Sequence, residues 1–226
     1  MRARLIAAGA LALALGAGMA GPALADFSAC DSAFTAKDLP QRIDLWTLCI
    51  TKSGLTGAER AGAFNNRGID YNRIGREDKA FLDFTWAIEA DPYWGTAYLN
   101  RGLAYERRQD WPHALADFDK AAHLDPVDVR PHALLAEARL LLDCPDASVR
   151  NPAKAVEAAK ASLRYRDDAA THDVLASAYA AAGHADDAAR EESRAVELAT
   201  RSGEHLDEYK TRLDQLKAKA GAQSSG

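Results

Sequence analysis

The sequence predicts an all-α protein, a solenoid of about four helical hairpins with capping helices at its two ends. Three observations indicate this fold. A stretch of the chain repeats itself after 34 residues, apolar residues within the repeat recur at helical spacing, and proline closes each of the first two copies. Because one helical hairpin leaves an apolar side uncovered, the next copy is expected to stack on it.

The repeat is clearest when the chain is shifted by 34 residues, which places 61–92 on 95–126 without a gap. The identical pairs are Ala63/Ala97, Asn66/Asn100, Arg67/Arg101, Gly68/Gly102, Tyr71/Tyr105, Arg73/Arg107, Ala80/Ala114, Asp83/Asp117, Phe84/Phe118, Ala87/Ala121, Asp91/Asp125 and Pro92/Pro126. Matches of this density indicate two copies of one structural unit.

Each unit is expected to form two antiparallel helices. Phe64, Gly68 and Tyr71 share one face of the first helix, and Ala80 and Phe84 lie on the inner face of the second. Small residues let the helices approach closely, and proline ends the second helix because it disfavours helix in the residue before it. The structural signature is Gly68, Tyr71, Ala80, Phe84 and Pro92 in the first unit and Gly102, Tyr105, Ala114, Phe118 and Pro126 in the second.

Two charged pairs recur with the repeat. Arg67 and Asp83 in the first unit correspond to Arg101 and Asp117 in the second. We expect each pair to be a salt bridge that ties together the two helices of its unit. The alternative is a functional charge pair.

The pattern resembles the tetratricopeptide-repeat family. The residues that carry the resemblance are Asn66-Arg67-Gly68 with Tyr71, and the run from Ala80 to Pro92. The resemblance covers roughly residues 58 to 200 and weakens along the chain. The third unit contains a longer turn between 143 and 152, and His172 replaces an aromatic residue near the start of the fourth. The resemblance to this family implies an α-solenoid that binds a protein or peptide and does not catalyse a reaction.

The expected organisation has four parts. They are a signal peptide over 1–25, an N-terminal capping segment over 26–57, a repeat array over 58–203 and a C-terminal capping helix with a tail over 204–226. The units of the array are expected at about 59–92, 93–126, 127–166 and 167–200.

The signal peptide is expected from the first residues. Arg2 and Arg4 precede a short apolar run, and Ala23-Leu24-Ala25 fits a small-x-small cleavage site, so a cut is expected between Ala25 and Asp26. The apolar run is short for a membrane span, and the alternative is an uncleaved anchor. We therefore expect a periplasmic or secreted protein with no stable membrane insertion after cleavage.

Three cysteines are present, Cys30, Cys49 and Cys144. Export permits a disulfide, and we expect Cys30 to pair with Cys49 because both lie in the short segment before the repeats. A pair that includes Cys144, or three free thiols, are the alternatives, since sequence does not fix connectivity.

Composition and motifs limit the function classes. The net charge is −5, and it becomes −7 without the first 25 residues, which hold two arginines and no acid. An acidic chain has no overall attraction for nucleic acid or for an anionic membrane surface, so we expect no nucleic-acid partner. The mature chain has no zinc-protease, nucleophile-elbow, P-loop or dinucleotide-binding motif. We therefore expect no catalytic residues, no metal site and no cofactor.

The partner is expected on the concave face lined by the first helix of each unit or at the long turn of the third unit, and Trp94 and Trp111 are further candidate contacts. Asparagine can donate to and accept from a peptide backbone, and arginine can grip a carboxylate. The candidate residues are Asn65, Asn66, Ile69, Asn72, Arg73, Asn100, Leu103, Arg107 and Arg130.

Three other modes of action are alternatives to this groove. Some family members clamp a partner's C-terminal carboxylate, but only Asn100 and Arg130 match that pattern here, so the clamp is incomplete. A structural role through self-assembly of the solenoid edges is one alternative function. An enzyme that uses Cys144 with His132 is another, and a buried cysteine is the simpler interpretation.

Overall fold

The computed structural model describes residues 28–51, 54–125, 127–203 and 205–223. The expected signal peptide and Pro126 lie outside the described residues. Within those ranges the chain forms eleven helices and no strand, which confirms the all-α prediction. The helices are α1 (Ser28–Thr35), α2 (Leu39–Thr51), α3 (Gly57–Arg73), α4 (Glu77–Ala90), α5 (Gly95–Arg107), α6 (Trp111–Leu124), α7 (Arg130–Asp143), α8 (Pro152–Leu163), α9 (Ala169–Ala181), α10 (Ala185–Ser202) and α11 (Leu206–Gln223).

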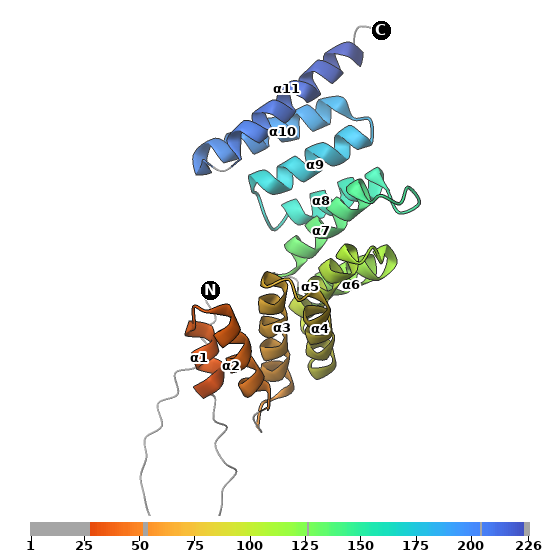
Figure 1. The fold of residues 1–226 in the computed structure, drawn as a ribbon. Coiled ribbons are helices and arrows are strands. Elements are labelled where there is room, and N and C mark those ends of the chain that lie inside the picture. The colour runs from red at the N-terminus through yellow and green to blue at the C-terminus, as the bar shows by residue number, and fades with distance from the viewer. Residues whose placement is uncertain (1–27, 52–53, 126, 204, 224–226) are drawn as a thin grey trace, which may run out of the picture.

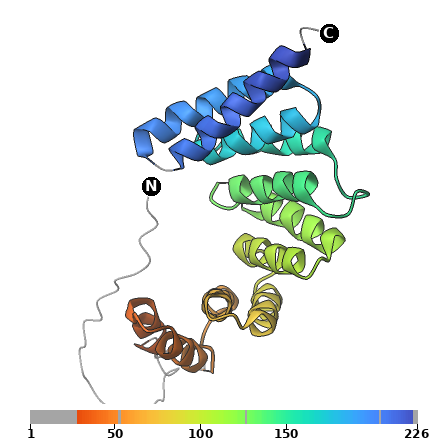
Figure 2. The same cartoon turned by 45° about the horizontal axis from the view of Figure 1, so that its top comes forward.

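The helices stack as a solenoid of hairpins (Figure 1). Four hairpins, α3/α4, α5/α6, α7/α8 and α9/α10, follow one another, with α1/α2 before them and α11 after them. The first helices of successive hairpins contact one another, α3 with α5, α5 with α7 and α7 with α9. We call α3, α5, α7 and α9 the inner helices and their partners the outer helices. Figure 2 shows the array bent into an arc with α1/α2 and α11 at its ends.

A glycine on the inner helix allows close packing in the first two hairpins. Phe84 and Phe118 are almost fully buried and face Gly68 and Gly102. A Cβ atom at Gly68 would lie 2.6 Å from Cε1 of Phe84, and one at Gly102 would lie 2.7 Å from the same atom of Phe118. Each ring therefore occupies the space that any other residue would fill with its side chain.

The recurring charged pairs are bridges within the hairpins. The guanidinium of Arg67 donates two hydrogen bonds to Asp83, at 2.9 and 2.7 Å. Arg101 donates two to Asp117, at 2.8 and 2.9 Å. Both carboxylates are buried, so each bridge satisfies a charge that would otherwise be stranded inside the hairpin.

The hairpin turns reuse one backbone conformation. Gly75, Gln109 and Gly183 all have positive φ, at 72°, 61° and 85°, and each lies just before an outer helix. Glycine reaches this left-handed region without cost, whereas Gln109 adopts it with a Cβ atom.

The third hairpin has a longer turn between α7 and α8, at the place where the sequence pattern is interrupted. Two contacts of Asn151 hold its end. The backbone N–H of Asn151 donates to the carbonyl of Leu141 at 2.9 Å, and its side chain accepts from the N–H of Lys154 at 3.0 Å and so caps α8. The turn is therefore fixed to both helices that it joins.

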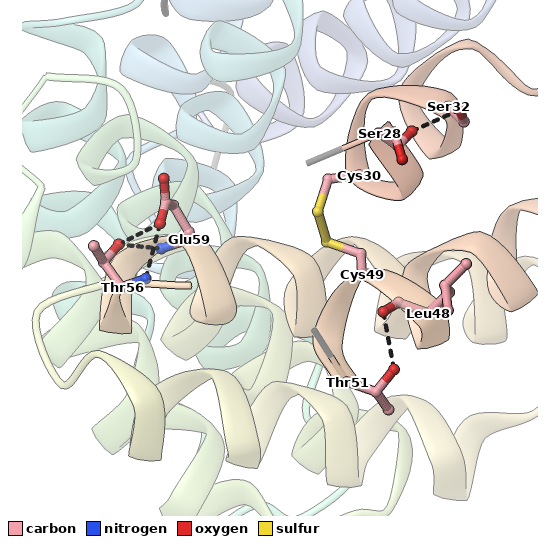
Figure 3. Close-up of a disulfide and its surroundings, with 8 residues drawn as sticks. All are labelled: Ser28, Cys30, Ser32, Leu48, Cys49, Thr51, Thr56 and Glu59. Carbon is pink, nitrogen blue, oxygen red and sulfur yellow. Dashed lines mark hydrogen bonds between the residues drawn. A yellow bond between two sulfur atoms is a disulfide. The ribbon is translucent and has the colours of Figure 1, made fainter. Parts of the chain in front are cut away.

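A disulfide joins Cys30 of α1 to Cys49 of α2 (Figure 3). Cys144 is free and buried. Helix α1 was not expected from the sequence. Trp46 of α2 is 2 % exposed and packs edge-on against Phe34 of α1. After the α1/α2 pair, Thr56 and Glu59 form a capping box at the start of α3, which Figure 3 also shows.

Helix α11 forms the other end of the array. Tyr209, Leu213 and Leu216 are its buried residues, and α11 packs on α10. Its remaining described side chains are mostly exposed and polar, as is expected of the last element of a stacked array.

The contact between Gly68 and Phe84 gives the first prediction. Gly68→Ala should lower the free energy of unfolding by about 1–3 kcal/mol, because the new methyl group overpacks the hairpin. Gly62→Ala is the matched control on the same helix, since its Cβ atom would meet Trp94 at an ordinary 3.5 Å. Urea denaturation measures both variants. Equal effects would contradict the proposed close approach.

The buried bridges give the second prediction. Asp117→Asn should destabilise the protein by about 3 kcal/mol, because Arg101 would keep a buried charge without its partner. Asp119→Asn on the same helix is the control, since the Asp119 side chain is 72 % exposed and should contribute less than about 1 kcal/mol. The comparison uses thermal and urea unfolding, and a small effect of Asp117→Asn would show that the bridge is dispensable.

Candidate partner-binding groove

The candidate residues of the concave face lie on α3, α5 and α7, and we call this face the groove. The structure brings Asn65 and Asn100 together, because Nδ2 of Asn100 donates to Oδ1 of Asn65 at 2.8 Å. Asn65 is only 4 % exposed. Contrary to its expected place on the groove surface, Asn65 therefore links two neighbouring hairpins.

Two other asparagines keep unused hydrogen-bonding capacity. Asn66 and Asn72 are half-buried on α3. Oδ1 of Asn72 is buried and has no partner among the described residues. The amide of Asn66 and Nδ2 of Asn72 remain able to bond to a peptide backbone.

Two apolar residues form the floor of the groove. Ile69 packs against Phe84 and Ala104, and Leu103 packs against the cluster that contains Phe118 and Leu140. Both are half-buried, so part of each side chain remains accessible.

The three arginines have different environments. Arg73 is exposed and lies 3.4 Å from Asp70, which is fully buried and also accepts from Arg42 of α2 at 2.7 Å. Arg107 is exposed and lies 3.6 Å from Glu77.

Arg130 was expected to be a binding residue, but its contacts are within the fold. Its Nε donates to the carbonyl of Ala122 at 2.7 Å, and its Nη1 donates to the hydroxyl of Tyr165 at 3.0 Å. It therefore holds the third hairpin to the second, which leaves little of its guanidinium for a partner.

A cavity of about 430 Å³ opens where α5 and α7 meet the long third turn. The residues that line it are Leu103, Glu106, Arg107, Trp111, Leu140, Asp143, Cys144 and Pro145. Burial raises the pKa of Glu106, and the positive charges of Arg107 and Arg139 partly offset this rise. The cavity therefore combines apolar walls with two carboxyl groups and one guanidinium.

Sequence reasoning found only part of this cavity. Leu103, Glu106 and Arg107 share the groove face that the repeat predicts. Asp143, Cys144 and Pro145 come from the interrupted unit, where the repeat register gives no guide to their position. Trp111 is a candidate contact from the sequence, but its place before the proline of α6 gives no helical-face signal that puts it in this cavity.

The chemistry expected of Cys144 is limited by its surroundings. Its side chain is 1 % exposed and packs with Phe118 and Leu140. His132 instead faces the guanidinium of Arg166, at 2.9 Å. Among the residues that the structure describes, no side chain hydrogen-bonds the thiol, and no three metal-ligating residues gather in one place. Across those same residues, no helix combines the length and apolar character of a membrane span.

Comparison with known proteins supports the repeat architecture. A family profile described as tetratricopeptide repeat matches residues 95–126, the segment that contains α5 and α6. The chloroplastic tetratricopeptide repeat domain-containing protein PYG7 of Arabidopsis thaliana is 35 % identical over 66 residues, which cover 29 % of this chain and 22 % of that protein. The chain spans about a fifth of the length of the curated relatives it matches.

Solved structures share the fold. A crystal structure of MamA aligns with a TM-score of 0.61 and 19 % identity, over 76 % of this chain and 95 % of that one. The thermophilic TPR protein TTC0263 of Thermus thermophilus aligns with a TM-score of 0.57 and 16 % identity, over 83 % and 95 %. Proteins built from these repeats generally act as scaffolds for protein interactions. The match over residues 95–126 identifies a tetratricopeptide repeat in this chain, and the stacked hairpins show the same fold on either side of it.

Proposed function

We propose that this protein is a non-catalytic scaffold that holds an extended segment of a partner protein along the groove, in the periplasm or the secreted space. The observation that carries the proposal is the cavity between α5 and α7, which Leu103 and Arg107 of inner helix α5 line. A volume of about 430 Å³ lies in the range of pockets that enclose a small ligand, so it has room for a side chain of the bound segment.

The residues of the groove fit a polypeptide. Asn66 and Asn72 supply amides that match a peptide backbone, and Ile69 and Leu103 supply an apolar floor. Arg107 stands at the rim of the cavity with more than a third of its side chain exposed. Backbone pairing and one side-chain pocket together give affinity with moderate sequence preference.

Two features support a location outside the cytoplasm. The first 25 residues have the order of a cleavable signal peptide. The disulfide between Cys30 and Cys49 suits an oxidising compartment, because cytoplasmic thiols are kept reduced.

Photo-crosslinking tests the groove. A benzoylphenylalanine at Asn66 or at Arg107 should form an adduct with the same partner in envelope extracts. The same group at Lys120, exposed on outer helix α6, should form none. Adducts at all three positions alike would contradict a groove-specific partner.

The crosslinked segment then allows a quantitative check. Arg107→Ala should weaken its binding about tenfold, or about 1.4 kcal/mol, as measured by calorimetry. Arg164→Ala, an exposed arginine at the end of α8, is the matched control and should bind as the parent does. Unchanged affinity in Arg107→Ala would exclude the cavity rim as a contact.

The location is tested separately. Mass spectrometry of the protein purified from its source should give a mature N-terminus at Asp26 in the envelope or secreted fraction. An intact chain that begins at Met1 in the cytoplasm would contradict export, while the groove experiment would still stand.

A further inference from the structure

The fourth hairpin contains a charged residue in a position that is aromatic in the first two. In three outer helices, two buried alanines flank one buried residue at the same spacing. The sets are Ala80-Phe84-Ala87, Ala114-Phe118-Ala121 and Ala188-Glu192-Ala195. Glu192 is 0 % exposed, and neither of its carboxyl oxygens has a hydrogen-bond partner among the described residues.

The inner helix changes together with this position. The residue facing the ring is Gly68 or Gly102 in the first two hairpins, and at the same separation from Glu192 it is the fully buried Ala176. The methyl group of Ala176 fills part of the space that the ring occupies elsewhere. The site is therefore repacked for a smaller, polar side chain.

Two elements bring charged or titratable groups to Glu192, and a third acts on one of those groups. Inner helix α9 supplies Asp173, and α11 supplies Arg212 and Tyr209. Arg212 is ion-paired with Asp173 and lies 3.5 Å from the hydroxyl of Ser177 on the same inner helix. The positive charge of Arg139 of α7 also acts on Asp173.

These surroundings favour a proton on Glu192. Burial, together with the negative charge of Asp173, raises the pKa of Glu192 to about 8, although Arg212 opposes the shift. Two ionised carboxylates are both acceptors and leave each other unsatisfied, whereas one protonated carboxyl can donate to the other. Ionised Glu192 therefore has no hydrogen-bond partner, whereas its neutral form gains one in Asp173.

We propose that Glu192 is a proton-operated latch for α11. In its protonated form it donates a hydrogen bond to Asp173, and Asp173 in turn holds Arg212 of α11 on the last hairpin. When the proton leaves, an unpaired charge remains inside the α9–α10–α11 junction, and α11 detaches to let water reach it.

The way in which docking of α11 depends on pH follows from the different pKa of Glu192 in the docked and detached states. Detachment exposes Glu192 to water and returns its pKa toward the ordinary 4.5, while the docked form keeps it at about 8. The docked state is therefore most stable below the pKa of the detached form, and it loses this stability as the pH rises to the pKa of the docked form. Within that window, each pH unit increases the detached population by up to about tenfold, and above it the population levels off.

Detachment would uncover a defined surface. Leu216 of α11 packs over Ala176 and Ala188, and Tyr209 packs over Ala195 and Ala199. Acidic conditions therefore close the C-terminal end of the array, and alkaline conditions open it.

Hydrogen exchange of the α11 amides in the full chain tests the latch. After correction for intrinsic exchange rates, the opening constant should rise about tenfold per unit between pH 5.5 and 7.5 and flatten above 8. Glu192→Gln, which keeps the shape but cannot ionise, should give a flat profile over the same range. Glu197→Gln, at an exposed position of the same helix, should retain the parent slope.

Two results would overturn the proposal. One is a flat profile in the parent protein, and the other is an equal slope in Glu192→Gln, which would assign the titration to another group. Glu192→Met, which restores an apolar side chain at the Phe84 position, serves if the glutamine variant does not fold. The opening constant of this variant too should not change with pH, and a slope equal to that of the parent would contradict the latch.

Discussion

The approach of the two helices at Gly68 and Gly102 constrains much of the array. If another residue replaced either glycine, its Cβ atom would lie less than 3 Å from the buried ring of Phe84 or Phe118, and that ring would have to move. Because the ring also packs on the following inner helix, as Phe84 does with Ala104, its position helps to set the spacing between hairpins. The buried bridges from Arg67 and Arg101 then align the two helices along their length.

The fourth hairpin reaches the same architecture by other means. Glu191 occupies the repeat position of Asp83 and Asp117, but its partner is His172, one turn earlier on the inner helix than the arginines. His172 also contacts Asp167 at 2.9 Å. The acid of the outer helix is thus retained while the inner-helix partner changes, at the same hairpin in which glutamate replaces the ring.

Much of the fold could be predicted because its cause is local. The 34-residue shift locates α3 to α6, since the residues that repeat are those that pack within each hairpin. Helix α1 was missed because eight residues provide too few turns for a periodic signal. The groove was harder to predict, because the position of a residue along a helix indicates its face but not what the next hairpin places against that face. Asn65 and Arg130 both lie on the expected helices, yet they contact neighbouring hairpins instead of solvent.

The turn between α7 and α8 illustrates how such an array can gain specificity. Stacking uses the faces of the helices, whereas Cys144 and Pro145 belong to the turn and still form a wall of the cavity. The bond from Asn151 to Leu141 anchors the irregular segment at its far end, so added residues there need not disturb the core. The length of this turn can therefore change the shape of the recess while the helix faces that stack stay in place.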